Sequence, residues 1–539
     1  MMPGGGAAPG SGGGNLTRLL IGIVSMRLDR ILYPHILTYM FVTSNSSRLN
    51  TDIAIVGGGG AGLMAALSAA RSQARVTVLE KNPSIGGTTA LSVGTISAAG
   101  TRLQRKAGID DCADSHFADM EKFMGPLVER DNPVLRRLLV DTAPQIIDLL
   151  EELGVTFMGP LEEPPHSQPR LHAVLPHSRS FIRHLEKACR DAGVVFLTDA
   201  RVTGLSQHSG GICGIELEDG ARHVTAQRGV ILTSGDFSSA SADYKRTHMS
   251  GPLLKIRGVN AASTGDGQRI AEAVGAEVVN GDLAWGPEIR FFAPPRPSMV
   301  SRMPTSRAVA RTLQIAMDTL PKALLRPLLL RFVTTFLAPS LRLFEEGAIL
   351  VNKHGERFCD ERDRPQDAIG DQPDQIAWIV LDDQTARKFS EWPYFVSTAP
   401  GVGFAYLADY ATSRPDIYST APDLGGAAAR AGLPADAFEH SIRAYNDSCA
   451  TDESRRGLGD GPFHILGPAR SWIVFSEGGL RIDDKFRVLD KARNPIPGLF
   501  AAGSAGQGGA ILEGHGHHLA WAFVSGLLAG RAAAAARQA

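Results

Sequence analysis

The chain has 539 residues, enough for two or more packed units, and its 43% hydrophobic and 21% charged residues are ordinary for a globular protein. Its 55 basic and 56 acidic side chains nearly cancel, so no nucleic acid or other polyanion is expected as a partner. Five cysteines are scattered without a C-x-x-C pair. This pattern gives no support for an iron–sulfur cluster, c-type haem or structural zinc, and it indicates a reduced, cytoplasmic protein.

Residues 1–50 differ in composition from the rest of the chain. A Gly/Pro/Ala-rich start is followed by the apolar run Leu19–Val24, which is too short to span a bilayer. Charged residues interrupt the region, and no clear small-residue cleavage site follows, which argues against a secretory signal. We predict an extension that is disordered or dispensable, with Met26 or Met40 as alternative starts.

A dinucleotide-binding unit is predicted directly after this extension. Asp52–Val56 has the pattern of a short buried strand, and an Ala-rich helix follows a G-x-G-x-x-G turn. The three glycines of the turn permit a tight bend, close approach of backbone amides to a pyrophosphate, and close packing of helix on strand; they are Gly57, Gly59 and Gly62. A second strand, Val76–Leu79, ends in Glu80, placed to accept hydrogen bonds from a ribose.

The nucleotide is predicted to be FAD. Gly86-Gly87-Thr88-Thr89 forms a second loop of small residues just past Glu80, of the kind that passes beside a flavin. Near the other end, Gly506–Gly516 is a glycine-rich loop that leads into a helix from Leu519 to Ala536. The dipole of such a helix can stabilise negative charge on a reduced flavin ring.

The fold class predicted from this order is α/β, a Rossmann-like FAD-binding domain of parallel sheet and helices with an inserted α+β cap domain. The predicted boundaries place the first part of the FAD-binding domain at 51–258 and the cap at 259–400. Residues 401–539 then form a helical segment and return to the FAD-binding domain. Two helix starts, each with proline in the first turn, are predicted near Pro133 and Pro144.

One segment of the predicted cap has two interpretations. Leu320–Phe344 is apolar with spaced basic residues, which suits either a weak membrane-surface contact or a cap helix that packs its apolar face inward. The second interpretation is favoured, and three prolines break any single long helix.

Several motifs together resemble the flavoprotein family of fumarate reductase and succinate dehydrogenase, which also contains 3-ketosteroid dehydrogenases, urocanate reductase and L-aspartate oxidase. The resemblance covers roughly Asp52 to Arg531. The motifs that carry it are VGGGGAG, VLEK followed by IGGTT, GVILTSGDF, STGDG, GAILVNKHGERF, EGGLRID and PGLFAAGSAGQGG. They are specific for the family but not for the substrate.

The resemblance implies a mobile cap that closes over a substrate at the isoalloxazine ring. It implies FAD contacts at Gly57, Gly59, Gly62, Glu80, Gly86, Gly87, Thr88, Thr89, Val202, Asp266, Gly503, Ser504, His518 and Leu519. Ser504 departs from the acidic or amide residue usual at its position. No histidine lies between Lys81 and Thr101, so the FAD is expected to be noncovalent.

Departures from the fumarate reductase pattern argue against a dicarboxylate substrate. The family keeps an arginine in the final glycine loop and a histidine shortly before the G-G of the C-terminal strand. Here Glu513 and the segment Val474–Glu477 stand at these places, and neither offers the forked cationic donors that a dianion needs. The nearest candidates for the family's acid arginine are Arg364 and Arg362, with a surface charge cluster as the rival interpretation.

The ketosteroid dehydrogenase pattern also matches only in part, since Leu512 stands where those enzymes carry an acid/base tyrosine. We predict that Glu513 and His515, or His517 in its place, handle the substrate proton because imidazole titrates near neutral pH. Tyr406, Glu288 and Arg290 are the alternatives. The H-x-H-H of this loop is a poor metal motif because no carboxylate partner is assembled with it, so no metal site is predicted.

The predicted activity is FAD-dependent introduction or reduction of a C=C bond next to a carbonyl in a moderately apolar substrate, with an external electron acceptor or donor. Two alternatives are an electron-relay flavoprotein subunit and an amine or alcohol oxidase. The relay lacks a second redox motif in the sequence, and the oxidase does not share STGDG or the cap pattern.

Overall fold

The structure is a computed structural model that describes residues 48–218, 220, 222–295, 299–321, 326, 330, 333–335, 337–399, 403–452 and 455–536. The predicted extension at 1–50 therefore lies outside the described residues, apart from the start of the first strand. Part of the segment 320–344 also lies outside them, but its described residues Val333, Leu343 and Phe344 are buried in a hydrophobic core of the cap, which favours inward packing over a membrane-surface helix.

The main sheet joins strands from both ends of the chain. Its order is β21 (Arg487–Leu489), β22 (Pro495–Ala501), β9 (His223–Leu232), β1 (Arg48–Val56), β2 (Val76–Leu79) and β6 (Val195–Leu197), with β8 (Gly211–Leu217) paired to β9 and to β7 (Val202–His208). β1 and β2 run parallel, as do β22 and β9, with Leu499 opposite Val230. This confirms the α/β class, and the pairing of β22 with β9 joins the C-terminal segment to the sheet that also contains β1 and β2.

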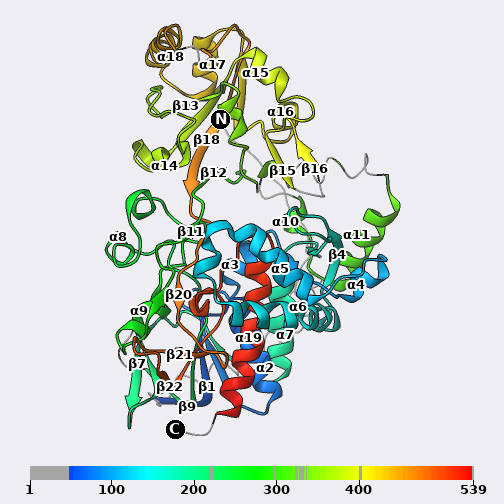
Figure 1. The fold of residues 1–539 in the computed structure, drawn as a ribbon, viewed down its shortest axis with the longest axis vertical. Helices are drawn as coiled ribbons and strands as arrows, with labels where there is room; N and C mark the ends of the chain where they lie inside the picture. The colour runs from blue at the N-terminus through cyan, green and yellow to red at the C-terminus, as the bar shows by residue number, and fades with distance from the viewer. Residues whose placement is uncertain are drawn as a thin grey trace, which may run out of the picture. The chain divides into compact units, whose positions relative to one another are not determined.

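Two helices from opposite ends of the sequence pack against each other beside this sheet: α2 (Gly60–Arg71) and α19 (His517–Ala535) (Figure 1). Two glycines on α19 permit the close approach. A Cβ at Gly526 would lie 2.4 Å from the carbonyl oxygen of Ala61, and one at Gly530 would lie 2.4 Å from that of Ala65. The helix that follows the glycine turn is thus fixed by the last helix of the chain.

A smaller sheet and further helices complete this part. The sheet has the order β3 (Thr95–Ser97), β5 (Leu171–Leu175) and β4 (Thr156–Leu161), and α7 (Arg179–Asp191) follows β5. α6 (Pro133–Leu153) starts at Pro133 as predicted, but the second start predicted at Pro144 is wrong because Pro144 lies inside this helix. The buried stripe of α6 continues on both sides of the proline, and its packing holds one helix together.

The cap is built on a five-stranded sheet with the order β12 (Glu288–Phe291), β18 (Phe463–Trp472), β14 (Ala377–Leu381) and β13 (Ile349–Val351), with β17 (Tyr418–Ala421) also paired to β18. Alternate residues face two separate hydrophobic cores: Leu350 belongs to one, and Ile349 and Val351 belong to the other. Since strands on both sides of residue 400 share this sheet, we propose that the cap spans 288–472 rather than the predicted 259–400.

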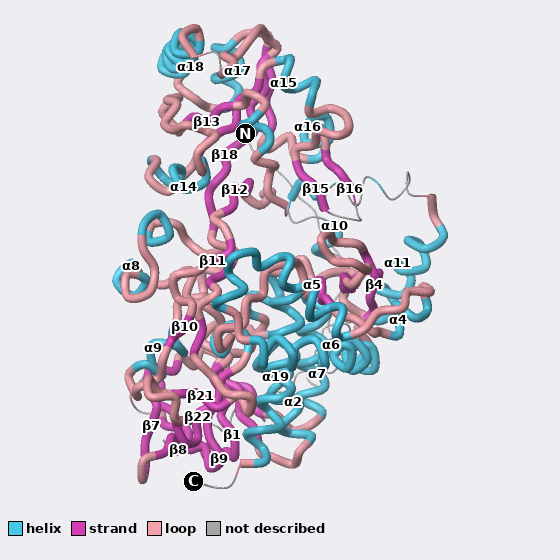
Figure 2. Tube along the Cα trace, in the orientation of Figure 1, coloured by secondary structure: helices cyan, strands magenta, loops and turns pink. Residues whose placement is uncertain are grey.

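The remaining helices and strands are short or connect these units (Figure 2). The helices are α3 (Gly87–Leu91), α4 (Arg102–Lys106), α5 (Ala113–Met124), α8 (Ala242–Lys245), α9 (Asp266–Glu272), α10 (Met299–Arg302), α11 (Arg307–Thr319), α13 (Arg342–Glu345), α14 (Pro365–Ile369), α15 (Asp383–Lys388), α16 (Leu407–Ser413), α17 (Leu424–Ala431) and α18 (Ala435–Cys449). The strands are β10 (Val278–Val279), β11 (Ala284–Trp285), β15 (Ser397–Ala399), β16 (Gly403–Ala405), β19 (Phe475–Ser476) and β20 (Gly479–Leu480).

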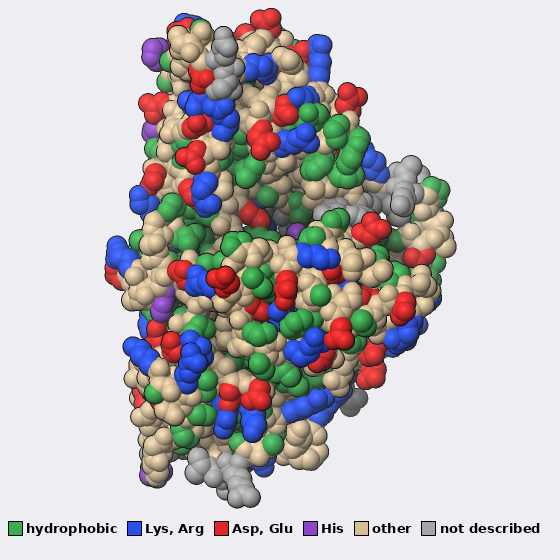
Figure 3. All heavy atoms as spheres, in the orientation of Figure 1, with side chains coloured by type: hydrophobic (Ala, Val, Ile, Leu, Met, Phe, Trp, Pro, Cys, Tyr) green, Lys and Arg blue, Asp and Glu red, His purple; other side chains and the backbone are tan. Residues whose placement is uncertain are grey.

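The surface matches the balanced charge of the sequence. On the face shown in Figure 3, basic and acidic side chains interleave across the elements. Within the described ranges, every helix is too short or too polar to cross a bilayer.

Candidate active site

The glycine turn between β1 and α2 lines a cavity at the edge of the main sheet. Gly57 has φ +111°, and a Cβ there would lie 2.6 Å from the carbonyl oxygen of Thr233. A Cβ at Gly62 would lie 2.0 Å from the carbonyl oxygen of Gly57, so this glycine serves packing. At Gly59 the nearest atom to an added Cβ is 3.9 Å away, because the position faces the cavity. These roles are those expected of a pyrophosphate cradle.

The predicted ribose acceptor already holds the turn in place. Glu80 is buried, and its Oε2 accepts a hydrogen bond of 2.9 Å from the backbone N–H of Gly58. Its Oε1 accepts from the side chain of Asn82 at 2.7 Å. The carboxylate also lines the cavity, so Glu80 couples the shape of the glycine turn to the nucleotide site.

Two cations line the same cavity, and both pair with Asp266. Its carboxylate pairs with Lys81 at 2.9 Å and with Arg201 at 3.2 Å. Burial alone would raise the pKa of Asp266, but hydrogen bonds and charge interactions with Lys81 and Arg201 outweigh it and lower the pKa. The sequence analysis missed both cations, although Lys81 directly follows Glu80.

The structure brings ten of the fourteen predicted cofactor residues to this one cavity. They are Gly57, Gly59, Glu80, Gly87, Thr88, Thr89, Val202, Asp266, Gly503 and Ser504. Gly86 pairs with Gly59 in an isolated bridge, and Gly62 packs behind the turn. His518 and Leu519 are not among the residues that line the cavity; they lie in the first turn of α19. Asn260 was missed: it lines the cavity and donates a hydrogen bond of 2.8 Å to Thr88.

These residues fit FAD by their geometry. Of the three motif glycines, only Gly59 has room for an added Cβ, and that room is the cavity itself. Gly59 lies at the N-terminus of α2, where backbone amides favour a pyrophosphate. Thr88 and Ser504, from opposite ends of the chain, both line it. A nucleotide held there would join the two halves of the domain.

The loop before α19 carries the predicted proton-transfer residues. The imidazole of His515 is about half exposed, and its Nδ1 contacts Oε1 of the buried Glu163, which also accepts a hydrogen bond of 3.0 Å from the backbone N–H of His515. His518 contacts the buried Glu477 at 3.1 Å and stacks on Phe475, with ring centroids 3.5 Å apart. Two buried carboxylates therefore hold two imidazoles of one loop.

The charges around this loop shift both predicted proton carriers in the same direction. Burial raises the pKa of Glu513, and the neighbouring Glu477 raises it further, while His518 partly opposes them. The hydrogen bond to Glu163 raises the pKa of His515 more than burial lowers it. Both side chains therefore bind a proton more readily than they would in water.

His517 belongs to a separate buried cluster with His116 and His166, whose ring nitrogens lie within 4.8 Å of one another. Arg170 donates to Nδ1 of His166 at 2.9 Å, so the hydrogen of the neutral ring sits on Nε2. His517 donates from Nδ1 to the carbonyl oxygen of Glu513 at 2.6 Å, and its Nε2 accepts from His116 at 3.1 Å. The partners thus favour a neutral hydrogen-bonded cluster over a metal site.

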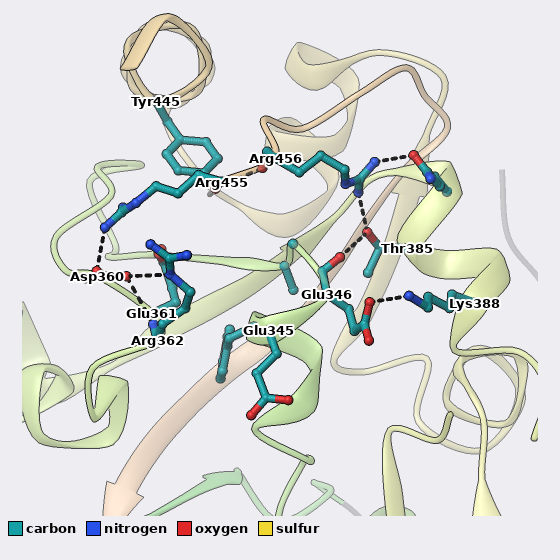
Figure 4. A pocket seen from close by; sticks show the side chains of 14 residues that line it. Glu345, Glu346, Asp360, Glu361, Arg362, Thr385, Lys388, Tyr445, Arg455 and Arg456 are labelled. Carbon is teal, nitrogen blue, oxygen red and sulfur yellow. Dashed lines mark hydrogen bonds and ion pairs between the residues drawn. The ribbon is translucent and has the colours of Figure 1, made fainter. Parts of the chain in front are cut away.

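The predicted arginines lie in the cap and pair with nearby aspartates. Arg364 is exposed, has φ +47° and pairs with Asp367 at 2.5 Å. Arg362 lines a pocket of about 230 Å³ in the cap, where Figure 4 shows it and Arg455 directed at Asp360. Opposite charges alternate around this pocket. That either arginine reaches the flavin when the cap closes stays a prediction.

Two of the three alternative residues lie near the loop and one does not. Trp285, whose ring lies 6.2 Å from that of His515, donates a hydrogen bond of 2.9 Å to Glu288. Glu288 in turn pairs with Arg290 at 2.8 Å. Tyr406 precedes α16 in the cap, where its backbone N–H donates to Asp409. The structure thus groups His515 with Glu288 and Arg290.

Known proteins are similar to this chain over most of its length, in sequence and in fold. It is 26% identical over 508 residues to the NADH:fumarate oxidoreductase of Klebsiella pneumoniae (strain 342), covering 90% of this chain and 47% of that protein. It is 28% identical over 529 residues to the vinyl phenol reductase of Lactiplantibacillus plantarum, covering 90% of this chain and 96% of that protein. The chain thus spans about half the length of the first relative and nearly all of the second.

The fold is also that of a 3-ketosteroid-Δ4-(5α)-dehydrogenase from Rhodococcus jostii RHA1. That structure matches with a TM-score of 0.56 and 22% identity, covering 92% of this chain and 98% of that one. The family model described as an FAD binding domain matches residues 52–293 and 319–514, which include the cradle, much of the cap and Glu513. The chain belongs to this family of FAD-binding domains, and its cofactor is FAD.

Proposed function

We propose that this protein introduces or reduces a C=C bond next to a carbonyl in a moderately apolar substrate. One observation carries the proposal: the groups around the final loop are mainly carboxylates, imidazoles and aromatic rings, and Arg290, the cation grouped with His515, is paired with Glu288 at 2.8 Å. The carboxylates are Glu163, Glu477 and Glu513, and the rings are Trp285 and Phe475. Such a site disfavours a dianion and suits an uncharged substrate.

FAD, when bound, supplies the hydride acceptor or donor for the β-carbon. The chain itself must move the proton at the α-carbon. His515 contacts Glu163 through Nδ1, which leaves Nε2 for the substrate side. For reduction, His515 or Glu513 gives a proton to the α-carbon as hydride reaches the β-carbon; for desaturation, the same group takes that proton as hydride leaves.

The relatives support this chemistry without fixing the substrate. By their names, one acts on fumarate and the other reduces a vinyl phenol, and both reactions concern a carbon–carbon double bond. The vinyl phenol is aromatic and carries neither a carboxylate nor a carbonyl, so this relative supports double-bond reduction on an uncharged substrate, and the adjacent carbonyl is the part of the proposal that the enones test. The electron donor or acceptor of this chain is taken to be an external partner.

The test is anaerobic and uses the FAD-loaded protein. Its flavin is reduced chemically, and its reoxidation is followed by absorbance with neutral enones, vinyl arenes or fumarate. We expect the best neutral substrate to react at least about tenfold faster than fumarate, a difference of about 1.4 kcal/mol in barrier. Fumarate reacting as fast would overturn the proposal. Reduction of the oxidised flavin by amines or alcohols, but not by saturated ketones, would identify an oxidase instead.

A further inference from the structure

Glu163 holds the backbone and the ring of His515 with one oxygen atom. It lies between β4 and β5, is 6% exposed, and comes from a part of the sequence 352 residues before its partner. Its Oε1 accepts from the backbone N–H of His515 at 3.0 Å and contacts Nδ1 of the ring. Two bonds to one residue fix both the loop and the ring orientation.

The contact also selects a tautomer. A carboxylate can only accept, so Nδ1 of His515 carries the hydrogen, and Nε2 is left to take up or release the proton that is exchanged. A carboxylate behind an imidazole also stabilises the ring when it is positively charged. Among the described residues, Oε2 of Glu163 is buried and has no hydrogen-bond partner, so the hydrogen bonds of this carboxylate go to His515, although its charge also raises the pKa of His517.

The loop that carries Glu163 is itself anchored. Arg170, at its other end, is fully buried and pairs with Asp111 at 2.7 Å and with Asp119. Asp119 also accepts hydrogen bonds from the backbone and side chain of Ser167. These bonds fix the C-terminal part of the segment 163–170, from Ser167 to Arg170, and the contact with His515 holds the Glu163 end.

We propose that Glu163 is a positioning residue that holds His515 in one tautomer and stabilises its protonated form for transfer to or from the substrate carbon. The part of this inference that concerns proton transfer to or from the substrate rests on the proposed function. Glu163 and His515 are two residues of the free protein, however, so their contact can be tested without any substrate.

The other charged groups that face His515 are few. Glu288 and Arg290 from β12 act on it with opposite signs, and they are paired with each other at 2.8 Å. Among the described residues, Glu163 makes the hydrogen bond to the His515 side chain, and this bond is the main cause that raises the pKa of the histidine. Removing its charge should therefore change His515 more than any other single substitution nearby.

The first experiment measures the titration of His515 in the FAD-bound protein by ¹⁵N NMR of the imidazole nitrogens, with His515→Gln used to assign the signal. We expect Glu163→Gln to lower the pKa of His515 by at least about one unit, since the amide keeps the size but loses the charge. Glu162→Gln, one residue away and exposed, is the matched control and should leave the titration unchanged. An unchanged pKa in Glu163→Gln would overturn the proposal.

The second readout is the pH profile of turnover. For reduction, activity depends on protonated His515 and is lost as pH rises through its pKa, so Glu163→Gln should move this limb to lower pH with little change in KM. Glu163→Asp keeps the charge and should restore part of the shift, which a merely structural role would not do. If Glu163→Gln does not fold, the ¹⁵N shifts of His515 in the wild-type protein still test the tautomer: a neutral ring that carries its hydrogen on Nε2 would overturn the proposal. Failure of the C=C assay alone would leave the NMR result standing.

Discussion

At the scale of single residues, the glycine turn separates packing from binding. Gly62 and Gly57 have backbone atoms within 3 Å of an added Cβ, whereas Gly59 faces open space and has an extended backbone with φ −79°. A side chain at Gly59 is therefore tolerated by the fold and blocks only the cofactor. This distinction can be tested directly.

We predict that Gly59→Val folds but does not bind FAD, because its methyl groups would occupy the space of the pyrophosphate. The measurements are the flavin absorbance of the purified protein and its far-UV circular dichroism. Gly62→Ala is the control of opposite kind: its Cβ would meet the carbonyl oxygen of Gly57 at 2.0 Å, so it should lose stability as well as FAD. A yellow Gly59→Val protein with normal FAD content would contradict the assignment.

Acid precipitation of wild type should release the flavin if it is noncovalent.

The loop residues make a second prediction at this scale. Glu513→Gln and His515→Ala should keep normal FAD content yet each lose more than about tenfold in kcat, which is over about 1.4 kcal/mol of transition-state stabilisation. The reason is that both groups favour the protonated state beside the expected substrate position. Steady-state rates at saturating substrate are the measurement. Near-normal kcat in both variants would move the proton-transfer role to Glu288 or Arg290.

Local signals lead to residues that line one cavity, because its glycines and Glu80 lie within one strand–turn–helix unit. They could not predict Glu163, which is 352 residues from His515 and has no motif of its own. The same holds for His116 and His166, which meet His517 only through the packing of separate helices and loops. Contacts made by tertiary packing leave no periodic pattern in the chain.

At the scale of elements, the pairing of α2 with α19 links the cofactor turn to the end of the chain. The N-terminus of α2 lies at the cofactor cavity, and the loop before α19 carries the residues for which we propose proton transfer. Both depend on a close helix–helix contact through small residues, so overpacking this contact should disturb the cofactor site from a distance.

We predict that Gly526→Val destabilises the protein by about 1–3 kcal/mol, the usual cost of overpacking, and weakens FAD binding. The cause is the 2.4 Å approach of its Cβ to the carbonyl oxygen of Ala61, which would push α2 away. Ala535→Val adds a β-branched side chain to an exposed position of the same helix and serves as the control. Denaturant unfolding and FAD titration are the measurements; equal behaviour of the two variants would show that the contact is not limiting.

In the cap, the sequence motifs indicate a single strand but not which strands pair with one another. The motif GAILVNKHGERF, which begins at Gly347, contains β13. The sheet does not support the boundary at residue 400, because β18 pairs with β12 and β14 of the earlier segment, and β17 pairs with β18. Strand pairing across 80 or more residues depends on the shared cores on either side of β14, and no local composition change marks it.

At the scale of the whole molecule, buried histidines connect stability to pH. Burial lowers the pKa of His172 and His517 to about 4, and it lowers that of His116 well below its ordinary value. Each ring is neutral in the folded state and completely buried. In the unfolded chain the same rings take up protons as pH falls through about 6.5.

The unfolded state therefore binds more protons than the folded state between about pH 6.5 and pH 4, and stability must fall as pH falls through this window. Each histidine contributes a slope of about 1.4 kcal/mol per pH unit at most, and the loss stops once pH is below its folded pKa. We predict a lower denaturant midpoint at pH 5 than at pH 7 with FAD held saturating, and a shallower dependence in His172→Gln. A midpoint unchanged between pH 7 and pH 5 would show that these rings are solvated or already charged in the folded protein, and the neutral cluster around His517 would have to be abandoned.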